Sequence, residues 1–474
     1  MKRIISSIVV STILSLVAVM SVVAQEGDSD AKTITILAVN DLHGALDRFP
    51  VFAGVVDSIR SEHPDLLLFA AGDIRTGNPV NDRHDEPGWP MVHLMNLIGF
   101  DASAVGNHEF DSQIEGFRNL INKSNFRYLC ANMEAPDSLR LHIAPYRFFE
   151  REGIRIGVIG LIQTGPNGFP DTHPDNVRGI RFQPAKEAVK DYRWMREQCD
   201  VLILLSHCGY MTDLDLAEAF PEADIIIGGH SHVAISNRML RNEIMIVQAG
   251  RELRYVSELS IELSGGRITN KSVKLIDMRE STQQNAEILS LVEEYNSSPL
   301  LRSVLTTVEK PFEQIDELGA LMADAQREAT QADIVLQNSG GVRYKTHPAG
   351  DFTMQDALSL DPFNNELITF HLKGAAIEQL ILSVCQMGED PFVSGITYEY
   401  IKGRVKVVLP DGKPIDSQKT YLVAMSSYLA AVCPYLQDKQ AINTGINATD
   451  ALIDYLKKQQ KVDYNGIRRS HITR

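Results

Sequence analysis

The sequence is short of positive charge. Its 474 residues include 46 Lys and Arg against 61 Asp and Glu, which gives a formal net charge of −15. This deficit argues against nucleic-acid backbones and anionic membrane surfaces as partners. A phosphorylated small molecule would also be repelled, unless metal ions or a local basic pocket attract it. The chain has neither an internal repeat nor a low-complexity tract.

Cysteine is scarce as well. The chain has 5 cysteines, an odd number, and none of them forms a CxxC pair. A disulfide is permitted in an oxidising compartment, but the spacing specifies none. Most of these side chains are therefore expected to be small buried hydrophobes.

Long apolar runs are missing except at the start of the chain. Lys2 and Arg3 precede an apolar stretch over residues 4–23, and Val22-Val23-Ala24 reads as a small-residue cleavage site. We expect residues 1–24 to be a signal peptide and the mature protein to be periplasmic or otherwise extracytoplasmic, with no stable membrane insertion. The alternative is a membrane anchor, because about 20 apolar residues span a bilayer. Because no cysteine lies near the cleavage site, a lipoprotein anchor is not indicated.

The chain is too long for one ordinary hydrophobic core, so two domains are expected. Residues 30–280 alternate short apolar runs with amphipathic helices, a pattern typical of an α/β domain whose sheet is covered on both faces. Residues 281–305 are predicted to form a linker helix, and residues 306–474 a smaller second domain. The strands predicted in the first domain are residues 34–39, 66–71, 102–105, 128–131, 154–161, 201–206, 224–227 and 245–248.

Metal-type ligands follow five of these predicted strands. They are Asp41 and His43, then Asp73, then Asn107 and His108, then His207, then His230 and His232. Each motif alone is weak, since a lone histidine at a strand end is usually structural and a Gly-Asp pair is usually a turn. The carboxyl ends of parallel strands, however, converge at one edge of a sheet. Imidazole and carboxylate together suit Zn, Mn or Fe, so the joint pattern predicts a metal site.

The ordered motifs resemble a known family. Asp41-x-His43, Gly72-Asp73, Gly106-Asn107-His108-Glu109, His207 and Gly229-His230-Ser231-His232 resemble the calcineurin-like metallophosphoesterase superfamily. Leu318-Gly319, Asp324-Ala325, Asn338-Ser339-Gly340-Gly341-Val342-Arg343 and Pro362-Phe363 are similar to the C-terminal domain of the bacterial periplasmic 5'-nucleotidase family. The resemblance covers essentially the whole mature chain. It implies a four-layer metallophosphoesterase-type β-sandwich with flanking helices, followed by a smaller α/β (α+β) substrate-specificity domain.

The resemblance also implies two divalent transition-metal ions, Zn, Mn or Fe. The residues implied around one ion are Asp41, His43, Asp73 and His232. Asp73 is implied to bridge to a second ion, whose other ligands are Asn107, His207 and His230. His108 is implied to be a general acid or transition-state donor, with Asp111 as its helper. Two such ions generate a water nucleophile near neutral pH without a covalent phosphoenzyme.

For the C-terminal domain, the resemblance implies arginines for the phosphate and two aromatic rings around a base. Arg343 matches the first feature, in a motif that begins at Asn338, although a turn with a solvated arginine is the alternative. Phe392 and Tyr428 lie near the two aromatic positions, although either ring could belong to the core. Two departures leave the substrate open. Phe312 stands where the family places a second arginine, and the family's ribose-contacting Gly-Gly-Asp is absent near residues 430–435.

We therefore expect an exported two-metal phosphohydrolase, a 5'-nucleotidase that releases phosphate from nucleoside 5'-monophosphates. Its partner is a small phosphorylated molecule. The enzyme alternative is a related phosphoesterase that acts on 2',3'-cyclic nucleotides, nucleotide sugars or other phosphate esters. The non-enzyme alternative is a nucleotide-binding surface protein, against which the intact ligand set speaks.

Overall fold

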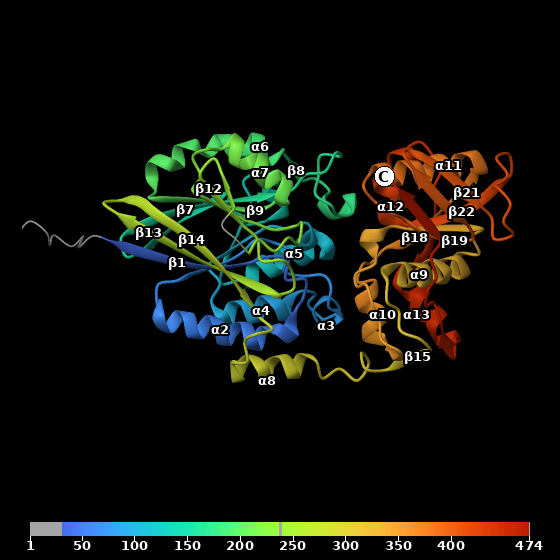
Figure 1. Cartoon of the computed structure of the whole chain (residues 1–474), viewed down its shortest axis with the longest axis horizontal. Helices are drawn as coiled ribbons and strands as arrows, with labels where there is room; N and C mark the ends of the chain where they lie inside the picture. The colour runs from blue at the N-terminus through green and yellow to red at the C-terminus, as the bar shows by residue number, and fades with distance from the viewer. Residues whose placement is uncertain (1–30, 237–238, 474) are drawn as a thin grey trace, which may run out of the picture.

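The computed structural model describes residues 31–236 and 239–473. The predicted signal segment, residues 1–24, lies outside these residues. Within the described ranges, no helix has the length and apolar character needed to cross a membrane. Figure 1 shows the N-terminal sheets on one side of the molecule and the C-terminal sheets on the other, with α8 below the N-terminal part.

The N-terminal part contains two six-stranded sheets, ordered β14-β13-β1-β2-β3-β4 and β11-β12-β10-β9-β7-β6. The strands of the first sheet are β1 (Lys32–Val39), β2 (Leu67–Ala70), β3 (Ala102–Ala104), β4 (Arg127–Leu129), β13 (Tyr255–Ser264) and β14 (Arg267–Asp277). Those of the second are β6 (Tyr146–Arg151), β7 (Ile154–Ile162), β9 (Val201–His207), β10 (Ile225–Gly228), β11 (Met239–Arg241) and β12 (Ile244–Val247). Strands β1 to β4 of the first sheet and β7, β9, β10 and β12 of the second are parallel, whereas β13, β14, β6 and β11 pair antiparallel.

The two sheets pack face to face between two layers of helices. Fully buried side chains such as Ile36, Ile156 and Ile203 fill the space between the sheets. The outer face of the first sheet is covered by α2 (Phe49–Glu62), α4 (Trp89–Ile98) and α5 (Gln113–Lys123). That of the second is covered by α6 (Ala185–Ala188), η5 (Val189–Gln198) and α7 (Tyr210–Ala219). The predicted four-layer architecture is therefore confirmed (Figure 1).

The predicted linker helix packs on the N-terminal part. It forms α8 (Ala286–Tyr295), whose Ile288 and Val292 join the core around α2. The backbone N–H of Asn285 donates to the Pro50 carbonyl at 2.9 Å. At its other end, the Tyr295 hydroxyl lies 2.8 Å from Nδ1 of His93. The helix is thus fixed to the N-terminal part, and residues 296–303 connect it to the C-terminal part.

The C-terminal part is built on a five-stranded sheet ordered β19-β16-β22-β18-β23. Its elements are β16 (Ile334–Gln337), β18 (Glu366–Lys373), β19 (Phe392–Ser394), β22 (Thr420–Ser426), β23 (Ile442–Asn447), α9 (Ile315–Thr330), α11 (Gly374–Gln386) and α13 (Ala448–Lys458). Because β16 and β22 are parallel and β18 is antiparallel to β22, the ends of β16 and β22 and the start of β18 lie at one edge. That edge faces the N-terminal part.

Smaller elements complete the chain. They are α3 (Pro79–Asp82), β5 (Met133–Glu134), β8 (Arg181–Phe182), β15 (Val304–Val308), β17 (Gly350–Thr353), α10 (Met354–Leu360), β20 (Thr397–Ile401), β21 (Arg404–Val408), α12 (Ser427–Val432), β24 (Lys461–Val462) and β25 (Ser470–Thr473). None of the five cysteines, all of which lie in the described ranges, forms a disulfide, and four of them are buried.

Candidate metal centre and interdomain cleft

Strand ends from both sheets converge on one polar centre. The residues brought together there are Asp41 and His43 after β1, Asp73 after β2, Asn107 after β3, His207 at the end of β9, and His230 and His232 after β10. These are the seven predicted ligands. Their donor atoms form overlapping groups within 4.8 Å, and Asp73 belongs to the group with His43 and His108 and to the group with His207 and His230.

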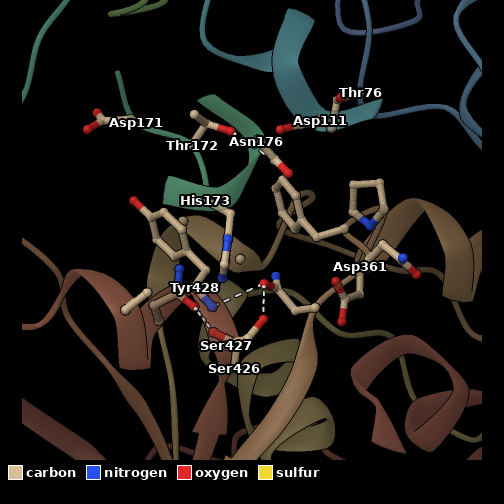
Figure 2. A pocket seen from close by; sticks show the side chains of 18 of the residues that line it. Thr76, Asp111, Asp171, Thr172, His173, Asn176, Asp361, Ser426, Ser427 and Tyr428 are labelled. Carbon is tan, nitrogen blue, oxygen red and sulfur yellow. Dashed lines mark hydrogen bonds between the residues drawn. The ribbon is translucent and has the colours of Figure 1, made fainter. Parts of the chain in front are cut away.

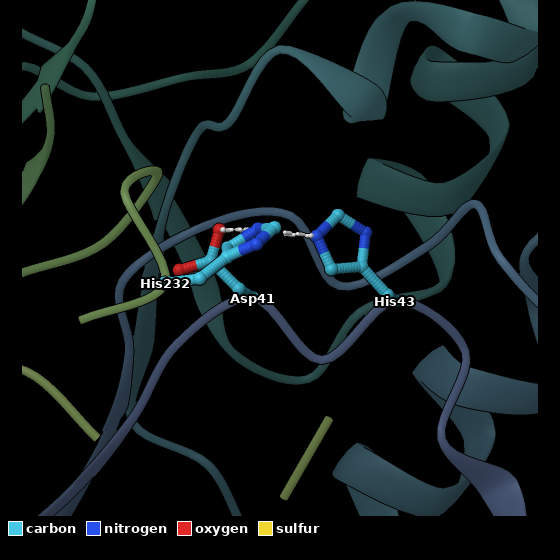
Figure 3. A group of neighbouring side chains, drawn as sticks. All are labelled: Asp41, His43 and His232. Atoms are coloured by element: carbon cyan, nitrogen blue, oxygen red, sulfur yellow. Dashed lines mark hydrogen bonds and ion pairs between the residues drawn. The ribbon is translucent and has the colours of Figure 1, made fainter. Parts of the chain in front are cut away.

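The first group combines Asp41, His43 and His232 (Figure 3). The Nε2 atoms of His43 and His232 lie 3.0 Å apart. Nε2 of His232 is 3.3 Å from Oδ1 of Asp41, and Nε2 of His43 is 4.0 Å from Oδ2 of Asp73. Ring nitrogens and carboxylate oxygens thus face a common point.

The second group surrounds the other side of Asp73. Nε2 of His207 lies 3.1 Å from Oδ2 of Asp73 and 3.2 Å from Oδ1 of Asn107. Nδ1 of His230 lies 3.1 Å from the same Asn107 oxygen. Asp73 therefore stands between the two groups, in the position of a bridging carboxylate.

The hydrogen-bond partners of His207 indicate that the centre suits a cation. Nδ1 of His207 lies 2.6 Å from the Ala71 carbonyl, which can only accept, so this nitrogen carries the ring proton of the neutral imidazole. Nε2 then has only a lone pair, yet it faces the oxygens of Asp73 and Asn107. Three acceptors converging without a donor are costly unless a proton or a metal ion lies between them. The donor set fits a divalent transition metal.

The ligand loops adopt an unusual backbone. Asp41, His43, Asp73, His230 and His232 all have positive φ, from 45° to 72°. This left-handed conformation costs a residue with a side chain about 1–2 kcal/mol. Tertiary contacts hold it in place: the N–H groups of Asp41 and His43 donate to the carbonyls of Gly72 and Asp73 at 3.1 and 3.0 Å. Such strain at a polar centre is typical of a functional site.

Glu109 links two of the ligand loops, a role that the sequence did not indicate. Its fully buried carboxylate accepts N–H groups from Asp73 at 3.1 Å, Ile74 at 2.8 Å and Gly106 at 2.5 Å. Burial, together with the charge of Asp73, raises the pKa of Glu109 to about 7. Glycine is required at position 106, because a Cβ there would lie 2.2 Å from Oδ1 of Asp73.

His108 is held at the edge of the centre. Its Nδ1 lies 2.7 Å from Oδ2 of Asp111, its backbone N–H donates to Oδ1 of Asp73 at 2.9 Å, and its Nε2 is 4.0 Å from Oδ2 of Asp73. Burial alone would lower the pKa of His108, but Asp111 and Asp73 raise it above its ordinary value. The side chain is therefore biased toward the protonated, donating form.

Charge coupling is strong at the bridging position. Burial alone would raise the pKa of Asp73, yet His207 and His108 lower it well below its usual range. Burial likewise opposes the charged form of His207, but Asp73 raises the pKa of this histidine to about 10. Without a metal ion, one proton is thus held between His207 and Asp73.

This coupling predicts that metal uptake releases a proton. At pH 8 His207 is protonated in the metal-free protein, because its pKa is raised to about 10, and it must lose that proton to become a ligand. Apparent metal affinity should therefore rise with pH up to about 10. Calorimetry of metal-stripped protein in two buffers of different ionisation enthalpy should show about one proton released from this site. The exposed His371 offers a control: His371→Gln should not change the count. Heats independent of the buffer would contradict the prediction.

The metal centre opens into a cleft of about 1050 Å³ between the two parts of the chain. From the N-terminal side it is lined by His108, Asp111 and residues 171–173, and from the C-terminal side by Arg343, Phe363 and Tyr428, among others. Figure 2 shows this arrangement, with Asp171 and Thr172 across the space from Ser426 and Ser427. The cleft therefore joins the metal centre to the edge of the C-terminal sheet.

Arg343 is the C-terminal residue that reaches the metal centre. Its Nη2 lies 3.2 Å from Nδ1 of His43, and its guanidinium carbon lies 5.6 Å from the centre of the Phe363 ring. Phe363 in turn stacks against His108, with ring centres 6.0 Å apart. Asn338 and Tyr428, the other predicted contacts that line the cleft, follow β16 and β22 at the same edge.

The structure corrects the interpretation of Phe392 as one of the two aromatic rings around a base. Its ring is buried in the core rather than in the cleft, on β19 against α9. A Cβ built at Gly319 would lie only 2.1 Å from this ring, so the ring occupies the space that the glycine leaves. Phe363 is the aromatic residue that lines the cleft instead, and the motif Pro362-Phe363 was its signal in the sequence.

The position of Phe312 supplies no phosphate contact. Its ring is 1% exposed and lies in the core against His347 and Tyr464. The neighbouring Lys310 pairs with Asp463 at 2.7 Å. The arginine and lysine side chains that line the cleft are Arg75, Arg83, Arg343 and Lys439.

Comparison with known proteins agrees with the class of protein that this fold and site define, a metal-dependent phosphoesterase. Residues 34–234 match the calcineurin-like phosphoesterase family, and residues 303–433 match the 5'-nucleotidase C-terminal domain. The chain belongs to the metallophosphoesterases that carry this C-terminal domain, and is a phosphoric ester hydrolase of that family.

Several relatives extend over nearly the whole chain. Protein UshA of Yersinia enterocolitica is 28% identical, over 91% of this chain and 92% of its own length. A 5'-nucleotidase of Vibrio cholerae is 27% identical, over 98% and 97%. The crystal structure of a 5'-nucleotidase precursor from Thermus thermophilus has a TM-score of 0.82 at 23% identity, and the match covers 93% of this chain and 99% of that one.

Proposed function

We propose that the chain is an exported two-metal 5'-nucleotidase that releases phosphate from nucleoside 5'-monophosphates. The observation that carries the proposal is the position of Asp73, shared between two donor groups at the floor of a cleft whose other wall presents Arg343 and aromatic rings. Asp41, His43 and His232 would hold one ion with Asp73. Asn107, His207 and His230 would hold the other.

Bound ions would activate water as the nucleophile and offset charge on the attacking and leaving oxygens. The chain's own groups do the rest. Arg343, beside His43, binds and orients the phosphate oxygens with a planar fork of donors. His108, oriented by Asp111, donates a proton or a hydrogen bond from Nε2 to the leaving oxygen. No covalent phosphoenzyme is required.

The nucleoside is assigned to the part of the cleft next to Arg343. Phe363 and Tyr428 line this region, and stacking on an aromatic ring is worth about 1–3 kcal/mol per base. The relatives named 5'-nucleotidase, such as that of Vibrio cholerae, support a nucleotide substrate.

The alternative substrates are 2',3'-cyclic nucleotides, nucleotide sugars or other phosphate esters. The specific observation that favours a substrate without free ribose hydroxyls, such as a 2',3'-cyclic nucleotide or another phosphate ester, is the cleft wall at Ala430 and Ala431, which carries no carboxylate for a ribose. The fold itself does not discriminate, because the Thermus thermophilus sulfate thiohydrolase SoxB shares it with a TM-score of 0.76 at 18% identity.

A substrate panel tests the nucleotide assignment. We expect kcat/KM for AMP to exceed that for glycerol phosphate, and Phe363→Ala or Tyr428→Ala to lower the AMP value about 10-fold, mainly through KM, while sparing glycerol phosphate. Tyr435→Ala is the matched control, because Tyr435 lies in the same segment but does not line the cleft. Equal rates with AMP and glycerol phosphate would contradict the assignment. Preference for a cyclic nucleotide or a nucleotide sugar would favour the alternative.

Export and domain limits complete the proposal. Residues 1–24 would be removed as a signal peptide, which places the mature enzyme in the periplasm or another extracytoplasmic space. Residues 30–280 would form the catalytic domain, residues 281–305 the linker helix and residues 306–474 the substrate-specificity domain. Mass spectrometry of the mature N-terminus checks the cleavage site.

A further inference from the structure

One cleft residue outside the predicted site contacts two ligands of the second group at once. Asp171 lies in the segment between β7 and β8, which borders the cleft (Figure 2). The segment begins beside a third ligand, because the N–H of Gln163 donates to the carbonyl of His207 at 2.9 Å. Asp171 thus sits on a loop that is tied to the second group of ligands.

The first contact fixes the amide of Asn107. Its Nδ2 donates to the backbone carbonyl of Asp171 at 3.1 Å. An amide has one donor end and one acceptor end, so this bond turns Oδ1 toward His207 and His230, at 3.2 and 3.1 Å. The oxygen, rather than the nitrogen, is thereby presented to an ion.

The second contact orients His230. Its Nδ1 faces Asn107, while Oδ2 of Asp171 lies 3.5 Å from its Nε2 on the other side of the ring. A carboxylate at the outer nitrogen places the ring proton there and leaves the inner nitrogen free to bind an ion. It also makes that nitrogen a stronger donor, and partners of this kind change metal affinity by about 10- to 100-fold.

We propose that Asp171 is a positioning residue for the second metal ion, setting that ion's affinity through both Asn107 and His230. The inference rests on the proposed two-metal function. The carboxylate of Asp171 also lines the cleft, so the same side chain contacts a ligand of the second metal position and forms part of the cleft wall. Its side chain is 54% exposed, so the expected effect lies at the lower end of that range.

The test is metal titration of the full chain by competition with a chelator, using Mn²⁺ and Zn²⁺. Wild type should bind two ions. Asp171→Ala keeps the backbone carbonyl that Asn107 contacts and removes the carboxylate at His230, so it should bind the first ion with unchanged affinity and the second about 10-fold more weakly. Asp171→Asn, which keeps an oxygen acceptor but loses the charge, should lie between them. Asp175→Asn is the matched control, because this carboxylate on the same loop faces His173 and Arg178 rather than a ligand. Activity that Asp171→Ala loses at low Mn²⁺ should return at high Mn²⁺.

The outcomes distinguish a failure of the role of Asp171 from a failure of the proposed two-metal function. Two ions on wild type with an unchanged second affinity in Asp171→Ala would overturn the role of Asp171 and leave the two-metal enzyme standing. A single ion on wild type would overturn both. Activity of Asp171→Ala that stays low at saturating Mn²⁺, with two ions bound, would also overturn the positioning role, because the residue would then act on substrate. Thermal unfolding of the metal-free proteins verifies that each variant folds.

Discussion

Asp73→Asn should bind neither metal ion tightly and should lose about 10³-fold or more in kcat/KM. Asp73 is the one carboxylate shared between the two groups of donors, 3.1 Å from His207 and 4.0 Å from His43. An amide of the same shape lacks the charge that offsets two divalent ions. Losing their stabilisation of transition-state charge costs several kcal/mol, and about 1.4 kcal/mol corresponds to tenfold in rate. Metal analysis and phosphatase assays on the same preparation measure both effects.

The control for this variant is Asp175→Asn, which removes an equal charge from the cleft wall without touching the centre. It should retain two ions and activity close to wild type. Asp73→Asn with two bound ions and activity within tenfold of wild type would show that Asp73 is not the bridge. Equal losses in both variants would attribute the effect to the general charge of the cleft.

The central strands could be predicted from the sequence because parallel strands are buried on both faces and appear as continuous apolar runs. The predicted strand over residues 201–206 corresponds to β9, in which all 7 residues are buried. The prediction over residues 154–161 likewise corresponds to β7. For such strands, the local sequence alone indicates that both faces are buried.

The antiparallel edge strands could not be recognised in this way. β14 carries the sequence RITNKSVKLID and has no fully buried residue, because one face of this long hairpin is open to water. β6 alternates in a similar manner, with Phe149 as its one buried residue. These strands form because they pair with β13 and β7, and their own composition does not indicate a strand.

The metal centre was predictable for a related reason. Each ligand lies at the end of a strand or within a few residues after it, so the topology of the sheets alone brings Asp73, His207 and the others to one edge. The cleft residues depend instead on contacts between distant segments. Phe392 lies near a strand end in the sequence, but the space left by Gly319 draws its ring into the core. Asp171 meets Asn107 and His230 only through the path of a loop, which no local pattern specifies.

His108→Ala should keep both metal ions and lose about 10²- to 10⁴-fold in kcat/KM with AMP, the range for a general acid. The backbone N–H of His108, which alanine retains, donates to Asp73, and Nδ1 is occupied by Asp111. Nε2 lies 4.0 Å from Oδ2 of Asp73, and His108 is not one of the seven predicted ligands. A proton donor matters most for a poor leaving group. The loss should therefore be much smaller with p-nitrophenyl phosphate, whose leaving group departs without protonation.

Asp111→Asn distinguishes two effects of Asp111 on His108, the raised pKa of the imidazole and the orientation of its ring. Asp111 helps to raise the pKa of His108, so removing its charge should lower that pKa and move the basic limb of the kcat profile to lower pH. The loss at neutral pH should be intermediate, and metal content should stay at two ions. Equal losses of His108→Ala on AMP and p-nitrophenyl phosphate would instead assign His108 to stabilising the equatorial phosphoryl oxygens, which both substrates share. Loss of an ion from His108→Ala would make His108 a ligand, as its place in one donor group with His43 and Asp73 allows.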